Sequence, residues 1–480
     1  MKIQFGNGAI DAHRLAQWCG GSLLNDQNGS LLVTGMCTDS READGSTVFC
    51  ALRGERTDGH NYIEAALSLG CKCVLCECLE GDLPPSVAVI LVEDTQRALA
   101  KFANAYRRTL ACKAVAVTGS VGKTTTKEMI AAVLSEAFVT YRTAGNHNSL
   151  VGMPLSVGEI SSDVEWAVLE MGMSGFGEIE RLSAAAEPDM AVITNIGTAH
   201  MELLGSRKNI CRAKLEILSG LRPGGTLILN GDEPLLRRVR GKSYKTVYVS
   251  LEGEKSDFSA KNIRVERDCT VFDLITEQGT VSDLRINVLG RHNVYAALFA
   301  IAIGTRIGMT EEQLRRGLLR FHTDGIRQSM TQCGDWTFFE DCYNASPESM
   351  MASLEVLRQY SSQTGRRSVA VLGDMLELGS ESCAMHQRVG AQLASMGIDS
   401  LITLGSFGRQ IADGARRAGM TAIFSMDNPA PAERRDAARQ ILDRLCPHDV
   451  VLFKASRGVG EEHLIAALKN LKEAEGEERT

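Results

Sequence analysis

Short apolar runs alternate with amphipathic stretches along most of this 480-residue chain. In the middle third the runs are nearly continuous in Val, Ile, Leu and Ala, which is typical of parallel strands buried on both faces of a sheet. After Arg320 a similar rhythm begins again. The predicted strands are 87–92, 114–117, 167–169, 190–194, 226–229, 368–372, 401–404, 422–424 and 450–453, and the clearest helices are 96–108, 381–395 and 433–445.

This order of elements predicts an α/β protein of three domains, because 480 residues exceed what a single hydrophobic core usually serves. Residues 1–95 are expected to form a small α/β domain of short elements separated by turns. Residues 96–323 are expected to form a central phosphate-loop ATPase domain around a parallel sheet. Residues 324–480 repeat strand and helix in the manner of a Rossmann-like, doubly wound domain.

The most informative segment joins the strand 114–117 to a helix and reads Thr118-Gly-Ser-Val-Gly-Lys-Thr-Thr-Thr-Lys-Glu128. A glycine turn that opens a helix on Lys-Thr presents backbone N–H groups and a positive charge to a polyphosphate, and its threonine can bind Mg²⁺. The full phosphate-loop pattern would place glycine at Val117, so this is a shorter form. A chance glycine turn is the competing interpretation, but the strand before it and the helix after it favour ATP binding.

Polar residues follow the next two predicted strands of the central domain. Glu170 comes directly after 167–169, and His200 lies shortly after 190–194. Because ligands of open parallel sheets bind at the carboxyl ends of the strands, we expect both side chains beside the phosphates, as cation ligands. Taken singly, Glu170 could cap a helix and His200 could be an ordinary loop residue; agreement of three strand ends favours a site. From its spacing alone, Lys214 is typical of a solvated helix lysine.

The composition of the chain argues against several classes of function and cellular location. The chain has 52 Lys and Arg against 59 Asp and Glu, a formal charge of −7, which argues against nucleic acid as an obligate partner. No run reaches the length of a membrane span and no signal segment is evident, so we expect a cytoplasmic protein. Fourteen cysteines then fit reduced thiols. The group Cys71, Cys73, Cys76 and Cys78 could suggest zinc, but its compressed spacing favours thiols packed on a strand.

Beyond single motifs, the chain resembles the Mur ligases, ATP-dependent amide-forming enzymes of peptidoglycan precursor synthesis. Thr118–Glu128 is similar to their ATP loop, and Asn146–Leu155 is similar to the loop before their metal-binding glutamate, here Glu170. Five further segments resemble a more restricted pattern, found in the members that add D-alanyl-D-alanine to a UDP-N-acetylmuramoyl-tripeptide. They are Thr194–Ser206, Ala213–Ile217, Asp341–Met350, Val371–Gly379 and Lys454–Gly458.

The resemblance implies a reaction through an acyl phosphate, with ATP, two Mg²⁺ ions and a monomeric enzyme. It implies Lys123, Glu170, His200 and Lys214 as catalytic, and Thr124, Glu170, His200 and a carbamylated Lys214 at magnesium. The implied nucleotide contacts are Gly119, Ser120, Val121, Gly122, Lys123, Thr124, Thr125, His292, Asn293, Arg327 and Asp341. The implied substrate contacts are Ser40, Arg41, Gly54, Asp58, His60, Asn146, Asn148, Ser149, Tyr343, Asn344, Lys454, Ser456 and Arg457.

Two positions depart from the family pattern: Ala296 stands where Asn is usual, and Ala455 replaces a glycine. Asp427-Asn-Pro429 is similar to a motif of the diamino-acid-adding relatives, but Ala430 replaces its arginine, so we expect a loop there. No residue is identified as the base for the attacking amine. Hinges near residues 110 and 323 are expected to close the domains and exclude water.

Three other functions share part of this pattern. Diamino-acid-adding ligases and folylpolyglutamate-synthase-like ligases have the same ATP loop, but the segments 341–350 and 373–379 favour D-alanyl-D-alanine. A phosphate-loop ATPase that moves a partner is the alternative of a different class. Such a protein would hydrolyse ATP without amino-acid substrates.

Overall fold

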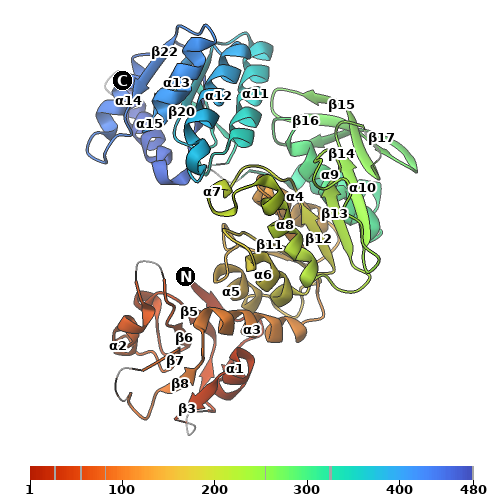
Figure 1. Ribbon diagram of the computed structural model, residues 1–480, viewed down its shortest axis with the longest axis vertical. Helices are drawn as coiled ribbons and strands as arrows, with labels where there is room; N and C mark the ends of the chain where they lie inside the picture. The colour runs from red at the N-terminus through yellow and green to blue at the C-terminus, as the bar shows by residue number, and fades with distance from the viewer. Residues whose placement is uncertain are drawn as a thin grey trace.

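The computed structural model describes residues 1–25, 29–54, 57–79, 81, 83–253, 256–323 and 327–477, with side chains as far as Ala474. The chain forms three α/β bodies in a row, with the N-terminal body at the bottom of Figure 1 and the C-terminal body at the top. Each has one main sheet. The predicted three-domain α/β class is therefore confirmed. The limits 1–95, 96–323 and 324–480 remain predictions, and residue 324, beside the expected hinge, lies outside the described residues.

The N-terminal sheet has the strand order β1-β5-β6-β7-β8-β3, in which β5 to β8 are parallel and the two edge strands are antiparallel to their neighbours. Its strands are β1 (Lys2–Gln4), β3 (Ser22–Leu24), β5 (Gly35–Cys37), β6 (Thr47–Cys50), β7 (Cys73–Cys76) and β8 (Ala88–Leu91), beside a ribbon of β2 (Ile10–Asp11) and β4 (Leu32–Val33). Its helices are α1 (Ala12–Cys19), η2 (Ser40–Glu42), η3 (Gly59–Tyr62) and α2 (Ile63–Ser68).

Helix α3 (Thr95–Arg108) lies between the N-terminal and central bodies, where the sequence predicts a helix over 96–108 (Figure 1). It begins after Asp94, whose carboxylate accepts the backbone N–H of Arg97 at 2.9 Å. Its apolar face carries Phe102 and Tyr106, which pack with aromatic rings of the first body. The Arg107 guanidinium is completely buried and donates to the backbone carbonyls of Ala186 and Cys112. One continuous core therefore joins the two bodies.

The central sheet has nine strands in the order β10-β11-β9-β12-β13-β14-β15-β16-β17, and the first six are parallel. They are β9 (Lys113–Thr118), β10 (Thr140–Arg142), β11 (Trp166–Glu170), β12 (Met190–Ile193), β13 (Thr226–Asn230) and β14 (Lys245–Ser250). An extension of β15 (Phe258–Val265), β16 (Thr270–Thr276) and β17 (Gly279–Ile286) continues the sheet. Strand β15 pairs in parallel with β14, whereas the β15–β16 and β16–β17 pairs are antiparallel, so the sheet is not parallel throughout.

Helices cover both faces of the parallel part because successive residues of its strands point to opposite sides. Ala114 and Ala116 face a core shared with α5 (Gly152–Gly158), α6 (Glu178–Ala186) and α8 (Arg207–Leu215). Val115 and Val117 face α4 (Lys123–Leu134), α9 (Asn293–Arg306) and α10 (Glu311–Arg320). The short α7 (Met201–Leu204) and η4 (Glu216–Ser219) complete the domain. Ala296, the first departure from the family pattern, is buried in the second core.

The C-terminal sheet has the order β18-β19-β23-β20-β21-β22, parallel except for β18. Its strands are β18 (Ser329–Cys333), β19 (Trp336–Glu340), β20 (Ser368–Leu372), β21 (Ser400–Leu404), β22 (Ile423–Met426) and β23 (Val450–Lys454). On one face lie α11 (Pro347–Thr364), α12 (Ser382–Ser395) and α13 (Gly408–Arg417), and on the other α14 (Arg434–Leu442) and α15 (Glu461–Glu477). The predicted doubly wound domain is confirmed, and Asp427-Asn-Pro429 is a loop as expected.

The cysteines have no disulfide partners within the described chain. Cys71, Cys73 and Cys76 are buried on and beside β7, and Cys78 is exposed. Among the described residues, no three His, Cys, Asp or Glu side chains come together as a metal site. No helix in the described part of the chain is both long and apolar enough for a membrane crossing.

Candidate active site

The phosphate loop joins β9 to α4. Gly119 has φ 155, and a Cβ there would lie 1.8 Å from the Thr194 hydroxyl, so only glycine fits against β12. Gly122 has φ 79 and precedes the first residue of α4. Lys123 Nζ folds back over the loop and donates to the carbonyl of Gly119 at 2.8 Å. The loop thus holds a positive charge at the N-terminus of α4, where anions bind; Thr125 follows one residue after Thr124 on the same helix.

The end of β12 fixes the shape of this loop. Asn195 Oδ1 accepts the backbone N–H groups of Ser120 and Val121, at 3.2 and 2.9 Å. The Thr194 hydroxyl donates to the carbonyl of Val121 at 2.6 Å. Sequence reasoning did not single out Asn195, although its place after a predicted strand was a usable signal. These three hydrogen bonds fix the conformation of the loop.

Glu170, at the end of β11, is hydrogen-bonded through both of its carboxylate oxygens. Thr124 Oγ1 donates to Oε2, and Asn148 Nδ2 donates to Oε1, each at 2.8 Å. The buried ammonium of Lys127 lies 3.7 Å from Oε2 and also donates to the carbonyl of Thr143. Glu170 itself is only 2% exposed. Three of the predicted residues, Glu170, Thr124 and Asn148, therefore lie together at the start of α4.

Two lysines, Lys123 and Lys214, have perturbed pKa values. Burial lowers the pKa of Lys123, with Arg327 lowering it further and Glu170 and Glu377 opposing the shift. Burial lowers the pKa of Lys214 well below its usual value, and repulsion from Lys123 adds to that. Lys214 is 1% exposed, so the prediction of a solvated helix lysine from its spacing is wrong.

His200 stands just before α7 with a left-handed backbone, φ 62. Its Nδ1 lies 2.9 Å from Oε2 of Glu377, which belongs to the C-terminal body. The hydrogen bond with His200 lowers the pKa of Glu377, against the effect of desolvation. A second contact crosses the same gap, since Thr198 donates to Glu348 at 3.1 Å. Neither glutamate was singled out from the sequence, although both lie in segments that resemble the Mur ligases.

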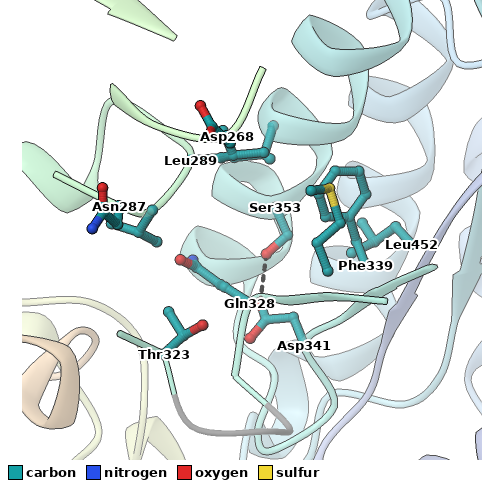
Figure 2. A pocket seen from close by; sticks show the side chains of 12 residues that line it. Asp268, Asn287, Leu289, Thr323, Gln328, Phe339, Asp341, Ser353 and Leu452 are labelled. Atoms are coloured by element: carbon teal, nitrogen blue, oxygen red, sulfur yellow. Dashed lines mark hydrogen bonds between the residues drawn. The ribbon is translucent and has the colours of Figure 1, made fainter. Parts of the chain in front are cut away.

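A pocket of about 160 Å³ lies where the central and C-terminal bodies meet, and Figure 2 shows Asn287 and Leu289 of the first facing Phe339 and Asp341 of the second. Gln328, on its wall, bridges the predicted nucleotide residues. It accepts from Asn293 at 2.7 Å and lies 2.5 Å from His292 Nε2. Burial lowers the pKa of His292 to about 4, so the ring is neutral at neutral pH.

Asp341 is held rigidly at the edge of this pocket. The Ser353 hydroxyl donates to its Oδ2 at 2.6 Å, the dashed line in Figure 2, and Lys454 Nζ lies 2.5 Å from the same oxygen. Lys454 also donates to the carbonyl of Asn344 and is only 2% exposed. Lys454, which is predicted to contact the substrate, contacts Asp341 and two backbone carbonyls here, and its substrate role stays a prediction.

Other predicted residues surround Asp341. The Arg327 guanidinium stacks 3.5 Å from the centroid of the Tyr343 ring, and that of Arg457 lies 5.0 Å away. The Ser456 hydroxyl accepts the backbone N–H of Leu376 at 2.9 Å. Ala455, the second departure from the family pattern, is fully buried with its methyl group against Gly373. Its methyl is accommodated because the facing residue has no side chain.

The predicted substrate residues of the first body form their own cluster, away from the phosphate loop. His60 uses both ring nitrogens within the protein: Nδ1 lies 2.6 Å from Asp58 Oδ1, and Nε2 accepts the backbone N–H of Glu77 at 2.9 Å. Asp39 accepts from Arg41, whose guanidinium is largely exposed, and Ser40 lies in the same short turn. Gly54 N–H donates to the carbonyl of Thr57 at 2.9 Å.

The loop before α5 carries the last predicted substrate residues. Asn146 is exposed, and its carbonyl accepts the backbone N–H of Asn148. The Ser149 hydroxyl accepts the backbone N–H of Gly152 at 3.1 Å, which caps α5. Of this loop, therefore, only Asn148 reaches the phosphate site, through Glu170.

Comparisons with known proteins agree with this architecture. Family models match at residues 32–107 (Mur ligase family, catalytic domain), 117–304 (Mur ligase middle domain) and 327–457 (Mur ligase, glutamate ligase domain). The UDP-N-acetylmuramoyl-tripeptide–D-alanyl-D-alanine ligase of Bacillus subtilis is 39% identical over 95% of this chain and 97% of its own length.

Solved structures superpose over nearly the whole chain. A crystal structure of MurF from Acinetobacter baumannii has a TM-score of 0.87 at 32% identity, covering 97% of this chain and 100% of that one. MurF ligase from Thermotoga maritima in complex with ADP has a TM-score of 0.80 at 27% identity, covering 92% and 98%. On the strength of full-length similarity in both sequence and structure, this chain belongs to the Mur ligase family.

Proposed function

We propose that this chain is an ATP-dependent ligase that joins D-alanyl-D-alanine to UDP-N-acetylmuramoyl-tripeptide, giving the UDP-linked pentapeptide precursor of peptidoglycan. The observation that carries the proposal is the 39% identity, over 95% of the chain, to the Bacillus subtilis ligase of that activity. The charges gathered at the ends of β9, β11 and β12 suit the reaction. The proposal includes a monomeric enzyme that acts in the cytoplasm.

The chemistry requires two anions to meet. The tripeptide carboxylate attacks the γ-phosphorus of ATP, ADP leaves, and an acyl phosphate forms. The dipeptide amine then attacks the acyl carbon, phosphate leaves with the carbon–oxygen bond electrons, and the nitrogen releases one proton as the amide forms. Lys123 and the backbone N–H groups at the start of α4 stabilise the phosphate charge that develops in the first step. The bonds from Ser120 and Val121 to Asn195 fix the turn that leads into this helix.

Magnesium fits the donor set at the start of α4. Thr124 Oγ1 and Glu170 Oε2 are hard oxygen ligands only 2.8 Å apart, and both face the loop that binds phosphates. We assign one ion to these two residues. When bound, it would neutralise phosphate charge.

A second ion is assigned to His200 and a carbamylated Lys214. The lowered pKa of Lys214 supports the modification, because only the neutral amine reacts with carbon dioxide. The nitrogen–carbon bond forms, a proton is released, and a buried cation is replaced by an anionic oxygen group. That change removes the repulsion from Lys123 and supplies oxygen ligands for magnesium.

The remaining predicted residues divide into two binding regions. The pocket beside Asp341 is assigned to the nucleoside of ATP, with Asp341 at the ribose, Arg327 toward the phosphates, and His292 and Asn293 shaping the wall. The cluster on the first body is assigned to the UDP-sugar; it comprises Ser40, Arg41, Gly54, Asp58 and His60. Tyr343, Asn344, Ser456 and Arg457 are assigned to the dipeptide, and Asn146, Asn148 and Ser149 to the tripeptide end.

Phosphate release tests the proposal. The purified protein is supplied with ATP, Mg²⁺ and the UDP-linked tripeptide, D-alanyl-D-alanine, or both. Phosphate release only when both substrates are present supports the ligase, provided that the mass of the product exceeds that of the UDP-linked tripeptide by one D-alanyl-D-alanine unit. Phosphate release at the same rate with and without the two substrates supports an ATPase that moves a partner. Activity with a free diamino acid or with glutamate in place of the dipeptide would identify the other ligases.

A further inference from the structure

Glu377 is a charged residue of the C-terminal body that the proposed reaction does not yet use. It lies between β20 and η5 (Gly379–Glu381) with φ 65, a left-handed conformation that residues other than glycine rarely adopt. His200, which it contacts, has φ 62. Two backbone positions of this kind therefore meet across the gap between the central and C-terminal bodies. Such positions persist where surrounding structure holds them, and they concentrate at functional sites.

The Glu377 carboxylate faces the proposed centre of the reaction. Its Oε2 lies 2.9 Å from His200 Nδ1, and its charge acts on the Lys123 ammonium. The side chain is 60% exposed, so a ligand arriving from solvent can reach it. Glu170, in contrast, is buried and has both oxygens hydrogen-bonded. Glu377 is thus an accessible carboxylate next to the phosphate site, carried on the body assigned to the dipeptide.

Neighbouring groups extend this position into a surface with two charged ends. Leu376 is 43% exposed, an apolar side chain open to solvent. Its N–H donates to the Ser456 hydroxyl, and a Cβ on Gly458 would lie 2.9 Å from its Cδ1. The loop of Glu377 therefore touches the loop of Arg457, which is also exposed. A carboxylate, an apolar side chain and a guanidinium lie on two joined loops.

We propose that Glu377 binds the ammonium group of the incoming dipeptide, with Leu376 against its methyl groups and Arg457 facing its carboxylate. The inference rests on the proposed function and adds to it the residue that receives the dipeptide nitrogen before that nitrogen loses a proton and attacks. An ammonium group approaching this place is repelled by Lys123 and Arg327, and a carboxylate at the edge offsets that repulsion. Binding at Glu377 also brings the nitrogen to the side of the cleft where Lys123 holds the phosphate.

The test compares wild type with E377Q and with a matched control, E202Q. Glu202 is an exposed carboxylate on α7. It lies against Gly379, and Gly379 is two residues after Glu377 in the sequence. Two probes are used: D-alanyl-D-alanine as substrate and D-lactyl-D-alanine as inhibitor, in which a hydroxyl replaces the ammonium group. Calorimetric binding of ADP verifies that each variant is folded.

Loss of one charged hydrogen bond predicts that E377Q raises the KM for D-alanyl-D-alanine about 10- to 100-fold. The KM for the UDP-linked tripeptide and the inhibition constant of D-lactyl-D-alanine should stay at wild-type values, and E377D should recover part of the lost affinity. E202Q should match wild type for every probe.

Two results would overturn the inference. A fall in kcat with an unchanged KM for the dipeptide would assign Glu377 to holding the bodies together through His200. Equal weakening of the ammonium and hydroxyl probes would show that charge recognition is not involved. A wild-type protein that does not consume D-alanyl-D-alanine would refute the proposed function itself. That result differs from a failure of the Glu377 inference, in which the wild type is active and only its comparison with E377Q goes against the prediction.

Discussion

The buried ion pair of Asp341 and Lys454 allows a quantitative test of the electrostatics at the pocket. The Lys454 ammonium lies 2.5 Å from Asp341 Oδ2 and donates to the carbonyls of Asp341 and Asn344. The two residues are 9% and 2% exposed. In Lys454→Met, the Asp341 carboxylate would stay buried with only the Ser353 hydroxyl to stabilise its charge.

Removal of one partner from a buried pair costs about 3–5 kcal/mol, because the remaining charge loses its counter-charge without regaining water. We expect Lys454→Met to lower the free energy of unfolding of the C-terminal body by that amount. The double variant Asp341→Asn/Lys454→Met lacks both partners of the ion pair, so neither is left buried without the other. It should therefore be more stable than the sum of the two single losses predicts.

The assay uses the three tryptophans, one in each body: Trp18, Trp166 and Trp336. In a Trp18→Phe/Trp166→Phe background, fluorescence reports on Trp336 alone. Its ring stacks on Phe338, which contacts Phe453 beside the ion pair. Urea unfolding followed in this way isolates the C-terminal transition. A loss below about 1 kcal/mol for Lys454→Met, or fully additive losses, would refute the reasoning.

Four further predictions concern the site. Lys123→Ala should abolish phosphate release with an unchanged circular dichroism spectrum; retained turnover would contradict its role. Lys214→Ala should lose activity that short carboxylates restore and bicarbonate does not, and full activity would end the carbamate assignment. Glu170→Gln should raise the Mg²⁺ concentration for half-maximal turnover about tenfold or more, and an unchanged Mg²⁺ titration would exclude it as a ligand. The pKa of His292 falls from 6.5 to about 4 on folding. Its contribution to the free energy of unfolding is therefore fully present above pH 6.5 and is lost as the pH drops toward 4. Urea unfolding at neutral pH and at about pH 5 should show a smaller decline for His292→Gln, and an equal decline would refute this cause.

Much of the parallel sheets could be predicted from the sequence, because a strand buried on both faces appears as a continuous apolar run. The run 368–372 coincides with β20, and the run 450–453 falls one residue short of β23. The antiparallel extension β15–β17 was not predicted. Its strands have exposed polar positions such as Lys261 and Arg264, and a partly solvated strand gives a weaker signal.

Within the site, the sequence could predict residues that share an edge of one sheet. Lys123 and Glu170 follow neighbouring strands β9 and β11, so the parallel topology alone brings them together. Residues that act through a second residue were harder to predict. Lys127 contacts Glu170 from inside a helix, where a lysine is normally solvated, and the burial of Lys214 is likewise set by packing rather than by spacing.

Contacts between bodies depend on how two rigid units are placed, and no periodicity within either unit specifies that placement. The pair His200–Glu377 illustrates the consequence, because each residue lies in a recognisable loop but their contact is visible only in three dimensions. Their positive φ angles add information that the sequence lacks. A left-handed conformation at a residue other than glycine costs on the order of 1–3 kcal/mol, and an exposed glutamate gains little from an ion pair at the surface. Stability therefore does not explain this geometry, whereas placing a carboxylate beside Lys123 for a cationic substrate does.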